Sequence, residues 1–261
     1  MALTAMWQQP GAIAMSTFRA AIRNRTLHGI LLGAVALVLS SIALGQLSVE
    51  NDARVIRDVG TTFVSLTMVT VAIFSGVSLL TAELSHKTIY TIVTKPVSRW
   101  MFIVGKFLGL VMTLAVVELL LGGVLLGLVV LRGDPFGVVL VQSLLLSLFE
   151  GVVVAAVAVF LSSFSTPVTS GVLTFGIFVL GRLRESLYRY AELSPSAALK
   201  GLMSVVGVVI PDLTLGRADL EVAELLPLNW SYVGYVAGYD LLYSTIVILL
   251  ACVIFSRRDF V

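Results

Sequence analysis

Long apolar runs separated by short polar segments dominate the chain. The runs are rich in Leu, Val and Gly and lack alternation, which favours helical spans over the strands of a membrane β-barrel. Most reach the roughly 20 residues that a helix needs to cross the hydrocarbon layer. The pattern predicts an all-α membrane protein with six transmembrane helices, at about residues 27–48, 61–82, 107–131, 136–160, 166–183 and 231–255.

The segment just before the first span, residues 11–26, is too polar to cross a membrane. Phe18 and Ile22 recur at helical spacing on one side, whereas Arg19 and Arg23 occupy other sides. This pattern is typical of a helix that lies in the headgroup region. We therefore predict an interfacial helix here; the alternative is a polar lead-in whose arginines only fix orientation.

A long connection, residues 184–229, separates the fifth and sixth spans. Ser194-Pro195 has the character of a helix start, with a capping hydroxyl followed by proline at the first helical position. The apolar run 197–210 is too short to span, so we expect it to be interfacial or re-entrant. The pattern of residues 218–225 predicts a second, short amphipathic helix.

Composition agrees with a membrane protein that crosses the bilayer several times. Only 12% of the 261 residues are charged, against about 25% in soluble domains, while 58% are hydrophobic and the mean hydropathy is +1.04. The single cysteine, Cys252, excludes an intrachain disulfide.

Basic residues near the ends of the spans indicate the orientation. The side that we assign to the cytoplasm carries Arg19, Arg23, Arg25, Lys87, Lys95, Arg99, Lys106, Arg257 and Arg258. The opposite side carries almost as many bases, but most lie in or beside the long connection, where the positive-inside rule has less force. We therefore expect a multi-pass protein of the cell (inner) membrane with both termini in the cytoplasm.

Three acids fall within predicted spans: Glu118 in the third, Glu150 in the fourth and Asp240 in the sixth. Each costs at least about 2.5 kcal/mol to place there. No Lys or Arg is predicted at a comparable depth, so an ion pair within the chain is not expected. Either these acids line a transport path or a subunit interface, or they are protonated and hydrogen-bonded to neighbours such as Ser147 or Tyr239.

Motifs for enzymatic chemistry are missing from the sequence. No Gly-x-x-x-x-Gly-Lys-[Ser/Thr] loop occurs to cradle nucleotide phosphates, and no hydrolase signature stands out. The two histidines, His28 and His86, are far apart and form no metal-binding pattern. We expect neither an enzyme nor a chain with a cofactor or metal of its own.

The longest charged segment between spans is residues 83–106, which contains Glu83, Lys87-Thr88-Ile89, Lys95-Pro96-Val97-Ser98-Arg99 and Gly105-Lys106. This series of residues resembles the cytoplasmic loop of ABC-2-type transporter permeases. Lys87 stands where that family commonly has glycine. Physically, Pro96 fixes a corner of the backbone, and Ser98 can cap a helix that begins near Arg99. The chain's ending, Phe255 to Phe260, is also similar to the family's.

This resemblance implies an architecture. Residues 1–26 would form a cytoplasmic N-terminus with an elbow helix, in which Phe18, Arg19, Ile22 and Arg23 take part, and residues 27–261 would form the transmembrane domain. A cytoplasmic coupling helix between spans 2 and 3 would dock on a separate ATPase. Its contacts would be Glu83, Lys87, Thr88, Ile89, Lys95, Pro96, Val97, Ser98 and Arg99.

The resemblance also implies partners and a function. Two ABC ATPase subunits would bind ATP and Mg²⁺, a second permease copy (as a homodimer) or a paralogue would complete the pathway, and lipid would surround it, with no nucleic acid involved. The function implied is that of the permease subunit of an ATP-driven exporter. The alternatives are an ion- or proton-coupled secondary transporter and a membrane scaffold that transports nothing.

Overall fold

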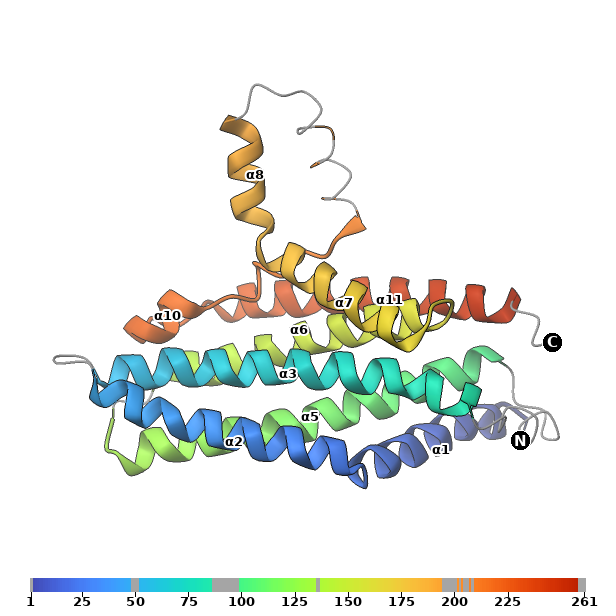
Figure 1. Ribbon diagram of the computed structural model, residues 1–261, viewed down its shortest axis with the longest axis horizontal. Helices are drawn as coiled ribbons and strands as arrows, with labels where there is room; N and C mark the ends of the chain where they lie inside the picture. Colours follow the sequence, from blue (N-terminus) through green and yellow to red (C-terminus); the bar gives the residue numbers. More distant parts are fainter. Residues whose placement is uncertain are drawn as a thin grey trace.

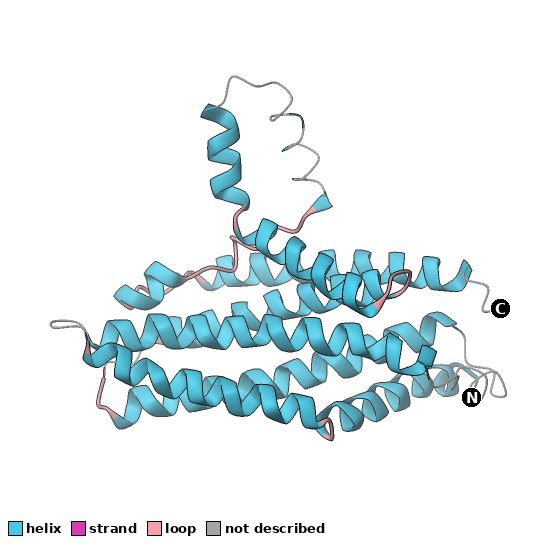
Figure 2. Cartoon of the chain, in the orientation of Figure 1, coloured by secondary structure: helices cyan, strands magenta, loops and turns pink. Residues whose placement is uncertain are grey.

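The computed structural model describes residues 2–47, 52–85, 99–134, 137–193, 201, 203, 207 and 209–257. Within these residues the chain consists of helices joined by short loops, and no strand occurs there (Figure 2). The predicted all-α fold class is therefore confirmed for this part of the chain.

Five long helices run along one common axis (Figure 1). They are α2 (Arg25–Gln46), α3 (Asp52–Ser85), α5 (Arg99–Leu131), α6 (Val138–Ser162) and α11 (Trp230–Arg257). Helix α6 is central, because α3, α5 and α11 all pack against it, while α2 packs against α3. Most side chains of α6 are consequently buried.

These five helices are long and apolar enough to cross a membrane, so the chain is a multi-pass membrane protein. The remaining predicted span is α7 (Pro167–Arg182), which begins with proline after Thr166 at the N-cap. Its 16 residues reach only about 24 Å, short of the roughly 30 Å hydrocarbon layer. Five of the six predicted spans thus coincide with helices that are long and apolar enough to cross, and a sixth crossing by α7 stays a prediction.

Helix α3 begins at Asp52, well before the predicted start at residue 61. The folded chain gives the charged residues near its start partners on α10 (Asp219–Glu224). Arg54 forms an ion pair with Glu224 at 2.9 Å, and the buried Arg57 donates to the carbonyl oxygen of Ala223 at 3.2 Å. Helix α3 therefore extends beyond the predicted span, and the boundary of that span in the membrane stays a prediction.

Helix α1 (Ala2–Ile22) packs along the first part of α5. A methyl group added at Gly109 would lie 2.5 Å from the carbonyl oxygen of Ala14, so the two backbones approach closely there. The helix starts earlier than residue 11 and ends before the predicted 26. Arg19 and Arg23 are exposed, as expected; whether α1 acts as an elbow stays a prediction.

Helix α8 (Arg184–Leu193) leaves the bundle at a steep angle directly after α7 (Figure 1). The sequence pattern did not predict a helix here. Tyr188 of α8 donates a hydrogen bond to the carbonyl oxygen of Met203, which ties α8 to the returning chain. The predicted helix over residues 218–225 corresponds to α10, whereas the predicted start at Ser194-Pro195 lies outside the described residues.

Most of the predicted coupling segment also lies outside the described residues: Lys87, Thr88, Ile89, Lys95, Pro96, Val97 and Ser98. Its flanks are described as backbone. Glu83 lies near the end of α3, and Arg99 is the first residue of α5. The segment therefore connects the two longest helices of the bundle.

Candidate functional site

An ion pair joins the buried Glu150 of α6 to the partly buried Arg182, the last residue of α7. The guanidinium donates from Nε to Oε1 at 2.7 Å and from Nη2 to Oε2 at 2.8 Å, and Glu150 is only 3% exposed. The expectation that no base lies at the depth of Glu150 was wrong. Because α7 is short, its terminal arginine lies beside the middle of α6 instead of at the end of the bundle.

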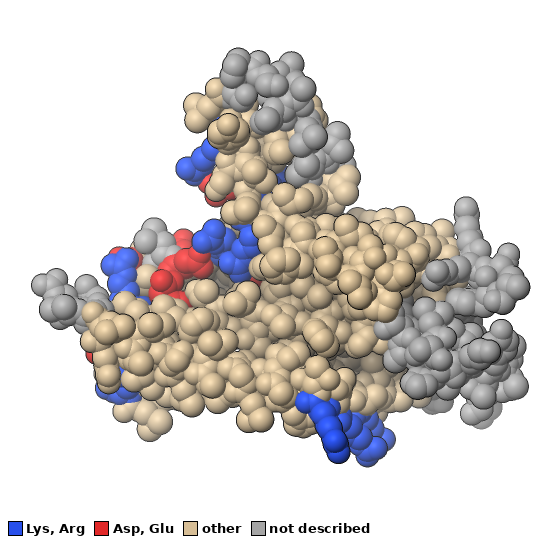
Figure 3. All heavy atoms as spheres, in the orientation of Figure 1, with Lys and Arg blue, Asp and Glu red and all other residues tan. Residues whose placement is uncertain are grey.

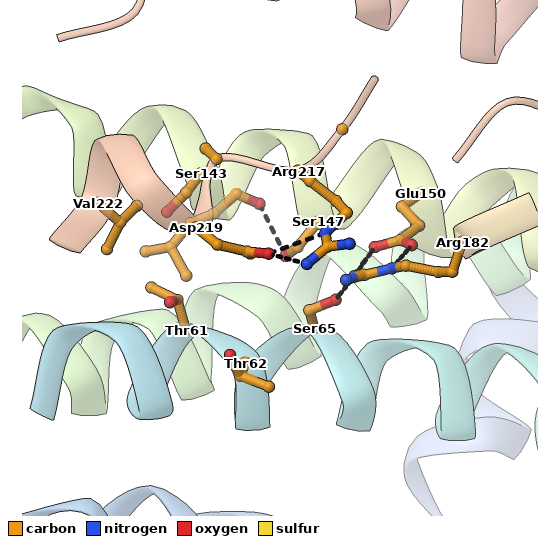
Figure 4. A pocket seen from close by; sticks show the side chains of 13 residues that line it. Thr61, Thr62, Ser65, Ser143, Ser147, Glu150, Arg182, Arg217, Asp219 and Val222 are labelled. Carbon is orange, nitrogen blue, oxygen red and sulfur yellow. Dashed lines mark hydrogen bonds and ion pairs between the residues drawn. The ribbon is translucent and has the colours of Figure 1, made fainter. Parts of the chain in front are cut away.

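Ser65 extends this pair to α3. Its Oγ accepts from Arg182 Nη2 at 2.7 Å and donates to Glu150 Oε2 at 3.0 Å, as Figure 4 shows. Three helices, α3, α6 and α7, therefore meet in one fully connected polar contact. We call Ser65, Glu150 and Arg182 the polar lock. Removing one partner from such a contact leaves a charge without compensation, which is costly in an interior.

Glu118 of α5 contacts the same stretch of α6. It is 6% exposed, and its Oε1 accepts a hydrogen bond of 2.7 Å from Ser147. Its other oxygen has no hydrogen-bond partner among the described residues. Ser147 and Glu150 are neighbours on α6, because residues three apart share a helix face. The hydrogen bond expected for Glu118 is present, whereas its protonation stays a prediction.

Asp240 of α11 completes the group of membrane acids. It is 3% exposed and close enough to Glu150 for their charges to interact. The hydroxyl of Ser244 donates to its backbone carbonyl oxygen at 2.7 Å, which is a bond within α11. All three acids predicted from the sequence are therefore buried and gathered around α6, from three different helices.

A small polar pocket leads from the α10 end of the bundle to the polar lock. Its cavity volume of about 30 Å³ can hold a few water molecules. The hydroxyl groups that line it belong to Thr61, Thr62, Ser65, Ser143 and Ser147. Arg217 and Asp219, an ion pair, lie across the pocket from Ser65 (Figure 4). The pocket is suited to water and small polar groups near the buried charges, and is too small for a large substrate.

The α10 end of the bundle is closed by further polar contacts. Gln142 of α6, fully buried, donates to the carbonyl oxygen of Leu228 at 2.8 Å and accepts from its N–H at 3.0 Å. Arg132 pairs with Asp52 at 2.7 Å. Figure 3 shows charged side chains gathered beside α10, on α8 and near the turn between α1 and α2. The bases beside α10 are thus offset by acids.

Several of these residues were not found from the sequence. Arg182 was assigned to the membrane edge, although a span too short for the bilayer signals that its terminal residues lie deeper. Ser65 and Gln142 give a weaker signal, because they are uncharged polar residues with other hydroxyl-bearing residues beside them, such as Thr67 and Ser143. Of the predicted elbow residues, Phe18, Arg19 and Ile22 lie on α1 and Arg23 follows directly after it. Helix α1 packs on α5, and none of the four residues belongs to the polar lock.

A comparison with models of known families identifies a family that this chain matches. Residues 23–181 match the model of the ABC-2 family transporter protein, which is more than half of the chain. The match includes α2, α3, α5 and α6 and ends one residue before Arg182. A search of curated proteins finds no match to the chain.

Proposed function

Because the chain belongs to the ABC-2 family of transporter proteins, we propose that it is the permease subunit of an exporter driven by a separate ATPase. The family match carries this proposal, together with five apolar helices that can cross the membrane. Family membership implies ATPase partners in general. We propose two ATPase subunits, which bind ATP and Mg²⁺, and a second permease copy or a paralogue; this chain would hydrolyse no ATP itself.

The arrangement of α3 and α5 supports a route for mechanical coupling. These two helices are joined by the segment that resembles a coupling loop, and each makes a polar contact with α6. Helix α3 does so through Ser65 and α5 through Glu118. Both contacts lie about 30 Å from the loop at 1.5 Å per residue. We propose that movement of the loop reaches α6 and α7 through these two rigid helices.

We propose that the polar lock responds to this movement of the helices. Its three residues come from three helices, so a relative shift of α3 or α7 must break at least one charge-assisted hydrogen bond. Packed interiors with discrete polar contacts favour two defined arrangements over continuous deformation. The lock would therefore separate two states of the permease, with its water pocket supplying substitute hydrogen bonds during the change.

We propose that both termini and the segment 83–106 lie in the cytoplasm, in the cell (inner) membrane. The density of Lys and Arg in that segment and the exposed Arg19 and Arg23 near the α1–α2 turn support this orientation. The α10 end, where arginines pair with acids, would then face outward. Labelling of single cysteines introduced near residues 92 and 215 from each side of the membrane tests the assignment.

A secondary transporter is the alternative that a specific observation favours. Glu118 and Asp240 are buried acids near Glu150, and such residues mark proton relays in many transporters. Flux driven by a proton gradient without ATP would support it. The substitutions Glu118→Gln and Asp240→Asn would then abolish transport.

The proposal is tested by reconstituting the chain with its ATPase in proteoliposomes. We expect Pro96→Ala or Arg99→Ala to lower transport per ATP hydrolysed while the complex stays in the membrane. Arg189→Ala is the matched control, because this exposed arginine belongs to α8, which projects away from the bundle (Figure 1). Normal transport by the loop variants would contradict the assignment of the loop.

A further inference from the structure

A second cavity lies at the root of α8, apart from the polar lock. One wall is formed by α11, which contributes Tyr235, Tyr239 and Tyr243 at four-residue spacing and Leu242 and Ile246 between and beyond them. We call this cavity the tyrosine groove. Its cavity volume of about 460 Å³ falls within the range of sites that hold small molecules. The structure thus contains a groove much larger than the water pocket.

The opposite wall of the groove is held in place by tyrosine hydroxyl groups. Tyr243 donates to the carbonyl oxygen of Val209 at 2.9 Å, and Tyr239 accepts from the N–H of Asp212 at 2.9 Å. The segment that contains Val209 and Asp212 therefore runs alongside α11. The groove is a built feature with two fixed walls, and it is open on the side of the bilayer, since Leu242 is 64% exposed.

The polarity of the groove changes along α11. Tyr235, 64% exposed, lies close to Trp230 in the aromatic belt that marks the membrane–water interface. Leu242 and Ile246 follow two and three turns deeper. From Tyr235 to Ile246 the helix rises about 16 Å, close to half of the roughly 30 Å hydrocarbon layer. The groove therefore extends from the interface into a single leaflet.

A guanidinium group lies against the segment that forms the opposite wall of the groove. Arg184 uses two of its five N–H donors on the carbonyl oxygens of Ile210 and Gly207, each at 3.1 Å. Its Nε lies 3.7 Å from a carboxylate oxygen of Asp212, an ion pair beyond hydrogen-bond length. Donors therefore remain for an anionic group, beside a carboxylate that can attract a cationic one.

We propose that the tyrosine groove holds one phospholipid of the leaflet at the α8 end of the bundle. Its acyl chain would lie along Leu242 and Ile246, and its phosphate would accept hydrogen bonds from Arg184. A phospholipid satisfies both ends of the groove, because it joins an apolar chain to a phosphate at the interface. The site is separate from the polar lock. The proposal does not depend on whether the chain exports or imports its substrate.

The proposal is tested by native mass spectrometry of the full chain released from nanodiscs of phosphatidylcholine. We expect one lipid per chain to survive release. Leu242→Trp fills the groove and should lower lipid occupancy about tenfold, which corresponds to about 1.4 kcal/mol. Leu241→Trp is the matched control, because Leu241 is 50% exposed at the same depth but does not line the groove. Equal occupancy in the two variants, or no retained lipid in the wild type, would overturn the site.

A second arm tests the role of Arg184. Nanodiscs that contain diacylglycerol with the same acyl chains supply the chains without the phosphate. The wild type should retain phosphatidylcholine in preference to diacylglycerol, and Arg184→Gln should remove that preference. The control Arg189→Gln changes an exposed arginine of the same helix and should leave the preference intact. If the wild type retains the two lipids equally, Arg184 does not bind the phosphate.

Discussion

Breaking the polar lock from one side should cost far more stability than removing it whole. Arg182→Met leaves the carboxylate of Glu150, 3% exposed, with only the hydroxyl of Ser65 as a described partner. It removes two charge-assisted hydrogen bonds, of 2.7 and 2.8 Å. Loss of one partner from a buried pair costs about 3–5 kcal/mol, so the unfolding equilibrium should shift by at least about a hundredfold.

The double variant Glu150→Leu/Arg182→Met removes both charges together. Replacing a buried pair by apolar residues is often neutral or stabilising, so we expect a stability within about 1 kcal/mol of the wild type or above it. The assay is unfolding by SDS in mixed micelles, followed by circular dichroism. Arg189→Met is the control: it breaks an exposed pair with Glu185 and should cost less than about 0.5 kcal/mol. A double variant less stable than Arg182→Met would refute the reasoning.

Three further predictions concern packing and hydrogen bonds, measured by the same unfolding assay. Gly109→Ala should cost about 1–3 kcal/mol by forcing α1 from α5, whereas Gly123→Ala, with open space around it, should cost nothing; equal effects would contradict the close contact. Gln142→Ala should cost about 2–4 kcal/mol, because both backbone groups of Leu228 lose their partner; an unchanged stability would show that water replaces the amide. Glu118→Gln keeps an acceptor for Ser147 and should change stability by less than about 1 kcal/mol, so lost transport by this variant would indicate a role in the pathway.

The sequence was sufficient to predict those helices that are marked by a local pattern of apolar residues. Apolar runs located the five long helices, and the predicted span 166–183 begins within a residue of the start of α7. The three membrane acids were recognised because an ionisable residue in a span needs a partner or a cavity. The start of α3 was missed for a related reason. Its charged side chains are satisfied by α10, more than 150 residues later, and no local pattern reveals such a partner.

The partner of Glu150 was missed because depth depends on how helices pack. Arg182 ends an apolar run, so it was placed at the membrane edge, yet α7 is too short to carry it there. The helix α8 was missed because its ten residues are polar and amphipathic, with no apolar run to mark them. The depth of Arg182 and the presence of α8 both depend on contacts between distant parts of the chain, which apolar runs in the sequence do not reveal.

The central claim is that this chain is the membrane part of a transporter whose ATPase is a separate protein. Native mass spectrometry of the complex purified from its own membrane tests this most directly. We predict a mass that corresponds to two permease chains, or one and a paralogue, with two ATPase subunits that carry P-loops. The chain recovered without any such ATPase, yet moving its substrate along an ion gradient, would contradict the claim.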